Sequence, residues 1–264
     1  MRGEKDRLRE GESTSARRVV KRWLRRLGLV AQRWPATRFS ATDAALALLC
    51  RNGFRPDVVI DVGANRGQWT SMARETFPDA VYHLVEPQHG CLPMLKQMAA
   101  RSPRIHVHAT AVTRPNVPTV MMVGGGDDKT GTGNFIPTRA ASAAGDNPMS
   151  YPSTTLDALF GNLRPPASRL LLKLDVEGHE LAVLEGARAL LRDVEVLVSE
   201  FWMFRIDGET MATLPELMAT LEDAGFILYD IGALQGRRSD NRLTSGDAIF
   251  VRRDSPLVTN SSWR

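Results

Sequence analysis

The sequence contains few cysteines and no long apolar run. Its two cysteines, Cys50 and Cys91, lie far apart, and no Cys-x-x-Cys pair or Cys/His spacing accompanies them. This excludes a disulfide-rich scaffold and a zinc knuckle, and it favours a reducing compartment. No stretch approaches the roughly 18 apolar residues that a transmembrane helix requires. The N-terminal charges are not followed by the apolar core of a signal peptide, so we expect a cytoplasmic protein.

Positive charge is concentrated at the N-terminus. Residues 1–38 hold twelve Lys and Arg against four Asp and Glu, a local charge of +8 in a chain of net charge +4, which leaves −4 for the remainder. Residues 1–16 lack apolar periodicity, and we expect them to be disordered. From Arg17 to Trp34, apolar residues recur at helical spacing with Arg and Lys on the opposite face. This pattern predicts a basic amphipathic helix.

Four interpretations of the basic helix stay open. It packs against the rest of the protein, lies on the anionic inner face of a membrane, forms a homo-oligomer contact, or binds nucleic-acid phosphates. Nucleic acid is the least favoured partner, because no aromatic-basic platform accompanies the helix.

Beyond this extension, short apolar strands alternate with amphipathic helices, which indicates parallel strands joined by crossover connections. The expected strands are Val58–Val62, Val81–Val85, Ile105–Val112, Leu170–Leu174, Glu195–Ser199, Phe226–Asp230 and Ala248–Val251. The expected helices are Thr42–Leu49 with Thr42 as N-cap, Gln68–Phe77, Leu92–Ala100, His179–Leu191 and Leu214–Ala224. The Gly-, Ser- and Pro-rich stretch from Gly124 to Pro152 predicts a long loop, preceded by a short strand at Thr119–Val123.

The first strand of this region ends in a glycine-containing loop, VVIDVGANRGQW. Its spacing is Gly-x-Asn-x-Gly, which differs from the Gly-x-Gly-x-x-Gly of dinucleotide-binding folds. An acidic residue before the loop suits a cationic ligand, such as the sulfonium nucleoside S-adenosylmethionine, better than a diphosphate. Asp61 is expected to accept a hydrogen bond from a ligand amine or to orient the loop. The cofactor-binding candidates here are Asp61, Gly63, Asn65, Gly67 and Gln68.

Two further strand ends are expected at the same edge of the sheet. Glu86 follows the strand Val81–Val85, about 20 residues beyond the glycine loop, where an acid accepts hydrogen bonds from the ribose hydroxyls of a nucleoside. The small residues around Ala111 leave room for adenine. We therefore add Glu86 and Ala111 to the cofactor-binding candidates.

A charged cluster, KLDVEGHE, follows the apolar strand Leu170–Leu174. Because an unpaired buried carboxylate is costly, we expect this cluster to face a ligand-filled crevice. Asp175 is expected nearest the methionine part of the cofactor. The candidates for the base that takes a proton from the acceptor are Asp175, Glu177 and His179, of which His179 has the unperturbed pKa closest to neutrality.

The same cluster contains residues with structural alternatives. Lys173 alternates with Asp175 along the strand, so the two share a face and form a candidate ion pair. Glu177 and Glu180 lie where carboxylates cap the first turn of a helix, which is the alternative to a role in catalysis.

These stretches resemble the FkbM family of S-adenosylmethionine-dependent methyltransferases. The matching pieces are Asp61–Gln68, Val85–Pro87, Lys173–Glu180 and Leu184–Ala187, within a resemblance from about Val58 to Arg252. It implies an α/β, Rossmann-like class I methyltransferase fold, with a mostly parallel seven-stranded sheet, helices on both faces and an antiparallel last strand. We accordingly divide the chain into an N-terminal helical extension (1–40), a methyltransferase domain (41–256) and a C-terminal tail (257–264).

The resemblance implies transfer of a methyl group from S-adenosylmethionine to a hydroxyl of a sugar, a glycolipid or a secondary metabolite. The expected partner is thus a small-molecule or glycan acceptor, and no metal site is assigned, because we find no partner acids for one. The alternative is a non-catalytic cofactor-binding adaptor at a membrane or nucleic acid. A nicotinamide-dependent dehydrogenase is a more distant possibility.

Overall fold

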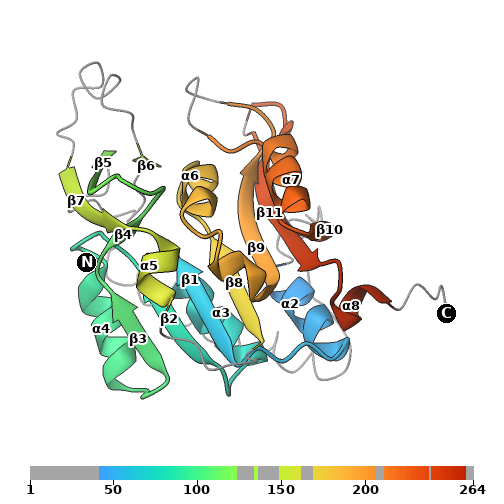
Figure 1. Ribbon diagram of the computed structural model, residues 1–264, viewed down its shortest axis with the longest axis horizontal. Coiled ribbons are helices and arrows are strands. Elements are labelled where there is room, and N and C mark those ends of the chain that lie inside the picture. Colours follow the sequence, from blue (N-terminus) through green and yellow to red (C-terminus); the bar gives the residue numbers. More distant parts are fainter. Residues whose placement is uncertain are drawn as a thin grey trace, which may run out of the picture. The chain divides into compact units, whose positions relative to one another are not determined.

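The computed structural model describes residues 42–123, 134–135, 149–161, 169–205, 211–237 and 239–259. Its main element is a seven-stranded sheet of order β10-β11-β9-β8-β1-β2-β3 (Figure 1). The strands are β1 (Val58–Val62), β2 (Val81–Val85), β3 (Ile105–His108), β8 (Leu170–Leu174), β9 (Val194–Trp202), β10 (Phe226–Gly236) and β11 (Leu243–Arg252).

Pairing within this sheet is parallel except around one strand. β1 pairs in parallel with β2 and β8, and β9 pairs in parallel with β8, whereas β11 is antiparallel to both β9 and β10. The central strands β1 and β8 are buried at every residue, as expected of strands that helices cover on both faces. The expected mostly parallel sheet with an antiparallel last strand is confirmed.

Helices cover both faces of the sheet. α2 (Thr42–Arg51), α3 (Gln68–Thr76), α4 (Leu92–Ala100) and α8 (Pro256–Thr259) contribute to one apolar cluster. α5 (Leu156–Phe160), α6 (Glu180–Glu185), the 3₁₀ helix η1 (Leu190–Arg192) and α7 (Leu214–Asp223) contribute to the other. Strand residues alternate between the clusters, so Val59 belongs to the first and Ile60 to the second. Leu257, which we expected in a C-terminal tail, is buried in the first cluster.

A second, four-stranded sheet lies between β3 and α5 in the sequence. Its order is β4-β7-β5-β6, with β4 (Ala111–Val112), β5 (Thr119–Val123), β6 (Asn134–Phe135) and β7 (Met149–Thr154). The prediction of one continuous strand from Ile105 to Val112 is therefore wrong, since its last two residues leave the main sheet and pair with β7. The predicted strand at Thr119–Val123 is confirmed, but β7 begins inside the stretch that we expected to be a loop.

The helix predicted from His179 to Leu191 is interrupted at Gly186, which ends α6. A Cβ atom at Gly186 would lie 2.2 Å from the carbonyl oxygen of Thr113, so this position requires glycine for close packing. At the other helix, Thr42 lies within α2 and its hydroxyl donates to Asp247, so it does not act as the predicted N-cap. The helix predictions for α3, α4 and α7 are confirmed to within one residue.

The N-terminal extension, including the predicted basic helix at 17–34, lies outside the described residues. Among the helices that the structure does describe, none has both the length and the apolar character needed to cross a lipid bilayer.

A substitution pair tests the close packing after β1. Gly63 and Gly225 have similar positive φ angles of 74° and 88°, but only at Gly63 would a Cβ collide with backbone, at 1.8 Å from the carbonyl oxygen of Asp175. We expect Gly225→Ala to lower the free energy of unfolding by about 1–2 kcal/mol, the ordinary cost of the left-handed conformation. We expect Gly63→Ala to lower the free energy of unfolding, measured in urea, by clearly more than Gly225→Ala does, because the added Cβ collides with the Asp175 carbonyl. Equal losses would contradict this account.

Candidate cofactor and active site

A pocket of about 510 Å³, partly open to solvent, lies at the carboxyl ends of β1, β2 and β8. In an open α/β sheet this is where ligands bind, because the connections to the following helices diverge there. Fourteen residues line it: Val62, Gly63, Asn65, Val85, Glu86, Pro87, Gln88, Thr110, Ala111, Val112, Met122, Asp175, Val176 and Glu177. The pocket thus joins the glycine loop, the end of β2, the second sheet and the segment after β8.

The glycine loop is held tightly between neighbouring strand ends. The amide of Gly63 donates to the carbonyl of Val85 at 3.0 Å, and the amide of Asp175 donates to the carbonyl of Val62 at 3.1 Å. Asn65 also has a positive φ, of 49°, although it is not glycine. The tight turn requires positive φ angles at Gly63 and Asn65. Because Gly63 has no Cβ, the ends of β1 and β8 can approach each other closely there.

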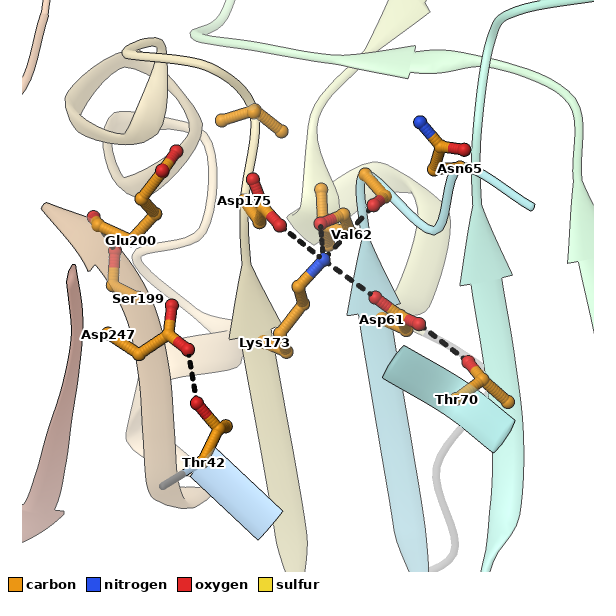
Figure 2. Close-up of polar contacts among 12 residues, drawn as sticks. Thr42, Asp61, Val62, Asn65, Thr70, Lys173, Asp175, Ser199, Glu200 and Asp247 are labelled. Carbon is orange, nitrogen blue, oxygen red and sulfur yellow. Dashed lines mark hydrogen bonds and ion pairs between the residues drawn. The ribbon is translucent and has the colours of Figure 1, made fainter. Parts of the chain in front are cut away.

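Lys173 links the ends of β1 and β8 (Figure 2). Its Nζ lies 3.1 Å from Oδ1 of Asp61 and 3.2 Å from Oδ2 of Asp175, and it donates to the carbonyl of Gly63 at 3.0 Å. The register places Asp61 beside Lys173 on one face of the sheet. The other oxygen of Asp61 accepts a hydrogen bond from Thr70 of α3 at 2.5 Å. The ion pair predicted between Lys173 and Asp175 is confirmed.

The charge on Lys173 is maintained by its partners. The residue is only 4% exposed, and burial by itself lowers the pKa of an ammonium group. The negative charges of Asp175 and Asp61 outweigh this effect and raise the pKa of Lys173. Lys173 is therefore a permanent cation beneath the pocket.

Glu86 is buried at the end of β2, with a side chain that two loops hold in place. One carboxylate oxygen accepts from the amide of Asn65 at 2.8 Å and the other from the amide of Gln88 at 2.9 Å. Burial raises the pKa of Glu86, although these two amides act in the opposite direction. The carboxylate is thus fixed in the pocket wall with lone pairs to spare, since each oxygen has more than one.

Asp175 and Glu177 bring carboxylates to the pocket from the segment after β8. Glu177 has a φ of 54°, a conformation that costs a non-glycine residue about 1–3 kcal/mol and that often marks a functional position. Burial, with a smaller contribution from the charge of Asp175, raises the pKa of Glu177 to about 7. A carboxylate with such a pKa is suited to accept a proton near neutral pH.

Glu180 and Glu200 are two further acids near Asp175 and Glu177, but neither lines the pocket. Glu180 is fully buried, and its Oε1 accepts from the amides of Val176 at 3.0 Å and Gly178 at 3.3 Å, so it closes the loop before α6. Burial raises its pKa to about 7. Glu200 lies at the end of β9, beside β8 (Figure 2). Burial and the surrounding carboxylates raise the pKa of Glu200 well above its ordinary value.

His179, one of the three candidates for the base, lies outside the pocket lining. Its Nε2 lies 2.8 Å from the hydroxyl of Thr113, and it is not among the residues that line the pocket. Burial and the charge of Arg114 lower the pKa of His179 to about 4, so its imidazole is neutral at physiological pH.

The pocket brings together most, but not all, of the predicted site residues. Those that line it are Gly63, Asn65, Glu86, Ala111, Asp175 and Glu177. Those that do not are Asp61, Gly67, Gln68 and His179. Asp61 is fully buried and contacts Lys173, which also donates to the carbonyl of Gly63 in the loop. Gly67 packs against Met98, where a Cβ would lie 2.4 Å from sulfur, and Gln68 is exposed on α3.

Eight of the fourteen lining residues were not among the candidates from the sequence, and they include Gln88 and Met122. Gln88 is 5% exposed, and its Oε1 has no hydrogen-bond partner among the described residues. An orphaned buried oxygen in a pocket wall is an acceptor available to a ligand. Met122 reaches the pocket from β5 of the second sheet. The position of Gln88, two residues after Glu86, could have drawn attention to it; nothing in the sequence distinguishes Met122.

The described residues contain no group of three or more His, Cys, Asp or Glu side chains arranged to hold a metal ion.

The chain belongs to the FkbM methyltransferase family. The family model, described as the methyltransferase FkbM domain, matches residues 61–228, from the end of β1 into β10. A comparison with curated proteins finds no match.

Solved structures of methyltransferases are similar to the chain at low identity. Methyltransferase FkbM from Methylobacillus flagellatus KT is 17% identical, over 74% of this chain and 43% of that one, with a TM-score of 0.46. Magnesium protoporphyrin IX methyltransferase from Synechocystis PCC 6803, solved with S-adenosylhomocysteine, is 12% identical over 80% of this chain and 81% of that one, with a TM-score of 0.46. The chain thus spans less than half the length of the first of these proteins.

The cofactor of this methyltransferase is S-adenosylmethionine. When bound, it supplies a methyl group activated on a positively charged sulfur. The pocket suits such a ligand, because Gln88 offers an unused acceptor, and Asp175 and Glu177 favour positive charge. No phosphate-binding glycine pattern is present in the loop Gly63–Gly67.

Removal of the buried cation is expected to destabilise the fold strongly. Lys173→Met leaves Asp61 and Asp175 without their shared partner, and breaking a buried ion pair in this way costs about 3–5 kcal/mol. Arg253→Met removes the exposed pair with Glu222 and should cost less than about 1 kcal/mol. Both values are measured by chemical unfolding, and similar losses in the two variants would show that Lys173 is not structurally important.

The raised pKa of Glu180 predicts a pH-dependent effect on stability. Because the folded state holds this proton up to about pH 7, while an unfolded glutamate releases it near 4.5, its contribution is present below about pH 4.5 and is lost as the pH rises through about 7. We expect Glu180→Gln to be about 1–3 kcal/mol more stable relative to wild type at pH 8 than at pH 5. The exposed Glu185→Gln is the control, and a difference that does not change with pH would refute the assignment.

Proposed function

We propose that this methyltransferase transfers its methyl group to a hydroxyl oxygen of a sugar, a glycolipid or a secondary metabolite. The observation that supports this most directly is the position of Glu177 in the pocket wall, with a pKa raised to about 7. A hydroxyl is a poor nucleophile until its proton is removed, so a base beside the acceptor assists the reaction. Of the three catalytic candidates, Glu177 fits this role best, since His179 lies off the pocket and Asp175 is engaged by Lys173.

In this proposal each strand end binds a different part of the cofactor. Glu86 accepts hydrogen bonds from the ribose hydroxyls, and the small side chains of Thr110 and Ala111 accommodate adenine. Gly63 and Asn65 contact the methionine part, which Asp175 also faces. Asp61 and Lys173 act on the ligand only through the loop that they hold.

The proposed reaction needs alignment and one proton transfer. The acceptor oxygen has to lie in line with the methyl carbon and its leaving sulfur, which the pocket achieves by holding both reactants at one wall. Glu177 takes the proton that the hydroxyl loses. Met122, from the second sheet, is placed to contact the acceptor, since it lines the pocket without belonging to any of the cofactor-binding strand ends.

The test is to follow methyl transfer and cofactor binding separately. Glu177→Gln should bind S-adenosylmethionine within about threefold of wild type but slow methyl transfer about 100-fold or more, the usual contribution of a general base. His179→Ala should slow it much less. Substrates are found by incubating extracts with methyl-deuterated cofactor and detecting labelled, methylated products by mass spectrometry. Products labelled only on nitrogen or carbon, or wild-type turnover in Glu177→Gln, would overturn the proposal.

A further inference from the structure

Among the residues that the structure describes, the carboxyl groups beside the pocket outnumber the cation near them, Lys173. We define the acidic cluster as Asp175, Glu177, Glu180, Glu200 and Asp247. These side chains come from three neighbouring parts of the fold, the segment after β8 with α6, the end of β9 and strand β11, where Asp247 is paired with Glu200. Each of the other four raises the pKa of Glu200 through its charge.

Within the described part of the chain, two groups that offset the charge of the cluster are Lys173 and Thr42. Lys173 is the cation that acts on Glu177 and Asp247, but it is already in contact with Asp61 and Asp175. The hydroxyl of Thr42 donates to Asp247 at 2.6 Å, and it is neutral. Burial and the repulsion between these carboxylates raise the pKa of Glu177, Glu180, Glu200 and Asp247, which favours a bound proton in the cluster near neutral pH.

Two oxygen atoms show that the cluster lacks donors even after folding. Oε2 of the fully buried Glu180 and Oε2 of Glu200 are both shielded from solvent, and neither has a hydrogen-bond partner among the described residues. A buried carboxylate oxygen without a donor is costly as an anion and much less so when its group is protonated. The geometry therefore favours a proton, or a positive charge in the pocket, at this position.

We propose that the acidic cluster releases a proton when the positively charged cofactor binds, and recovers one from the acceptor after methyl transfer. Asp175 and Glu177 line the pocket and so experience the sulfonium charge directly, while Glu180 and Glu200, which do not line it, interact with them through their charges. Binding of the cofactor would thereby ionise Glu177 and prepare it as a base before the acceptor reacts. The cluster then distinguishes S-adenosylmethionine from the uncharged-sulfur product S-adenosylhomocysteine.

Under this proposal, protons and charge balance over the reaction. The acceptor oxygen forms its bond to the methyl carbon, the carbon–sulfur bond breaks with its electron pair left on sulfur, and the acceptor's proton passes to Glu177. The positive charge that leaves the sulfur is thus replaced by the proton that the cluster gains. This second half rests on the proposed hydroxyl acceptor, whereas the first half depends only on the cofactor.

Calorimetric titration tests the first half without any acceptor. Wild-type protein is titrated with S-adenosylmethionine and with S-adenosylhomocysteine between pH 6 and 8, at each pH in two buffers that differ in ionisation enthalpy, which gives the number of protons released. We expect net release with S-adenosylmethionine near pH 6.5 and less with S-adenosylhomocysteine. The preference for S-adenosylmethionine should rise about three- to tenfold from pH 6 to pH 7.5, because one linked proton changes affinity by at most tenfold per pH unit.

Variants identify the groups that carry the proton. Glu177→Gln and Glu200→Gln should each reduce the difference in proton release between the two ligands, while the exposed Glu185→Gln on α6 should leave it unchanged. Equal proton release with both ligands in wild-type protein overturns the proposal, as does an unchanged difference in the two cluster variants. A failure of hydroxyl methylation alone would instead appear as absent O-methylated product with the proton release intact.

Discussion

The architecture of the pocket depends on one buried ammonium group. Lys173 draws together a carboxylate from β1 and another from the segment after β8, and it also binds the carbonyl of the intervening glycine turn. Without this cation, two acids at the ends of adjacent central strands would repel each other inside the protein. Because Lys173 neutralises both carboxylates inside the protein, the ends of β1 and β8 stay close together, and the pocket beyond them can bind a ligand.

Much of the central sheet was predictable because β1, β2 and β8 consist of short apolar runs that end in polar residues at the positions observed. The predictions failed where distant contacts decide the outcome. The stretch Ile105–Val112 has a uniform strand-like sequence, yet its last part pairs with β7, which the local sequence cannot indicate. Likewise, the break at Gly186 is imposed by the approach of the Thr113 carbonyl from another segment.

The candidate site, too, was predictable where local sequence decides the structure and not where distant contacts decide it. Residue type and strand-end position were enough to place Glu86, Asp175 and Glu177 at one pocket. They did not reveal that His179 bonds to Thr113, because that contact joins residues far apart in the sequence. The raised pKa of Glu200 follows from its burial and from four neighbouring carboxylates that come together only through the strand order of the folded sheet.

The pocket is built from residues of two sheets. The ends of β1, β2 and β8 belong to the main sheet, whereas Ala111, Val112 and Met122 come from the smaller sheet inserted between β3 and α5. Changes in the length or composition of that insertion can reshape one wall without disturbing the ion pairs under the other. Diversification of substrate range during evolution therefore has a place to occur that leaves the strand ends of the main sheet intact.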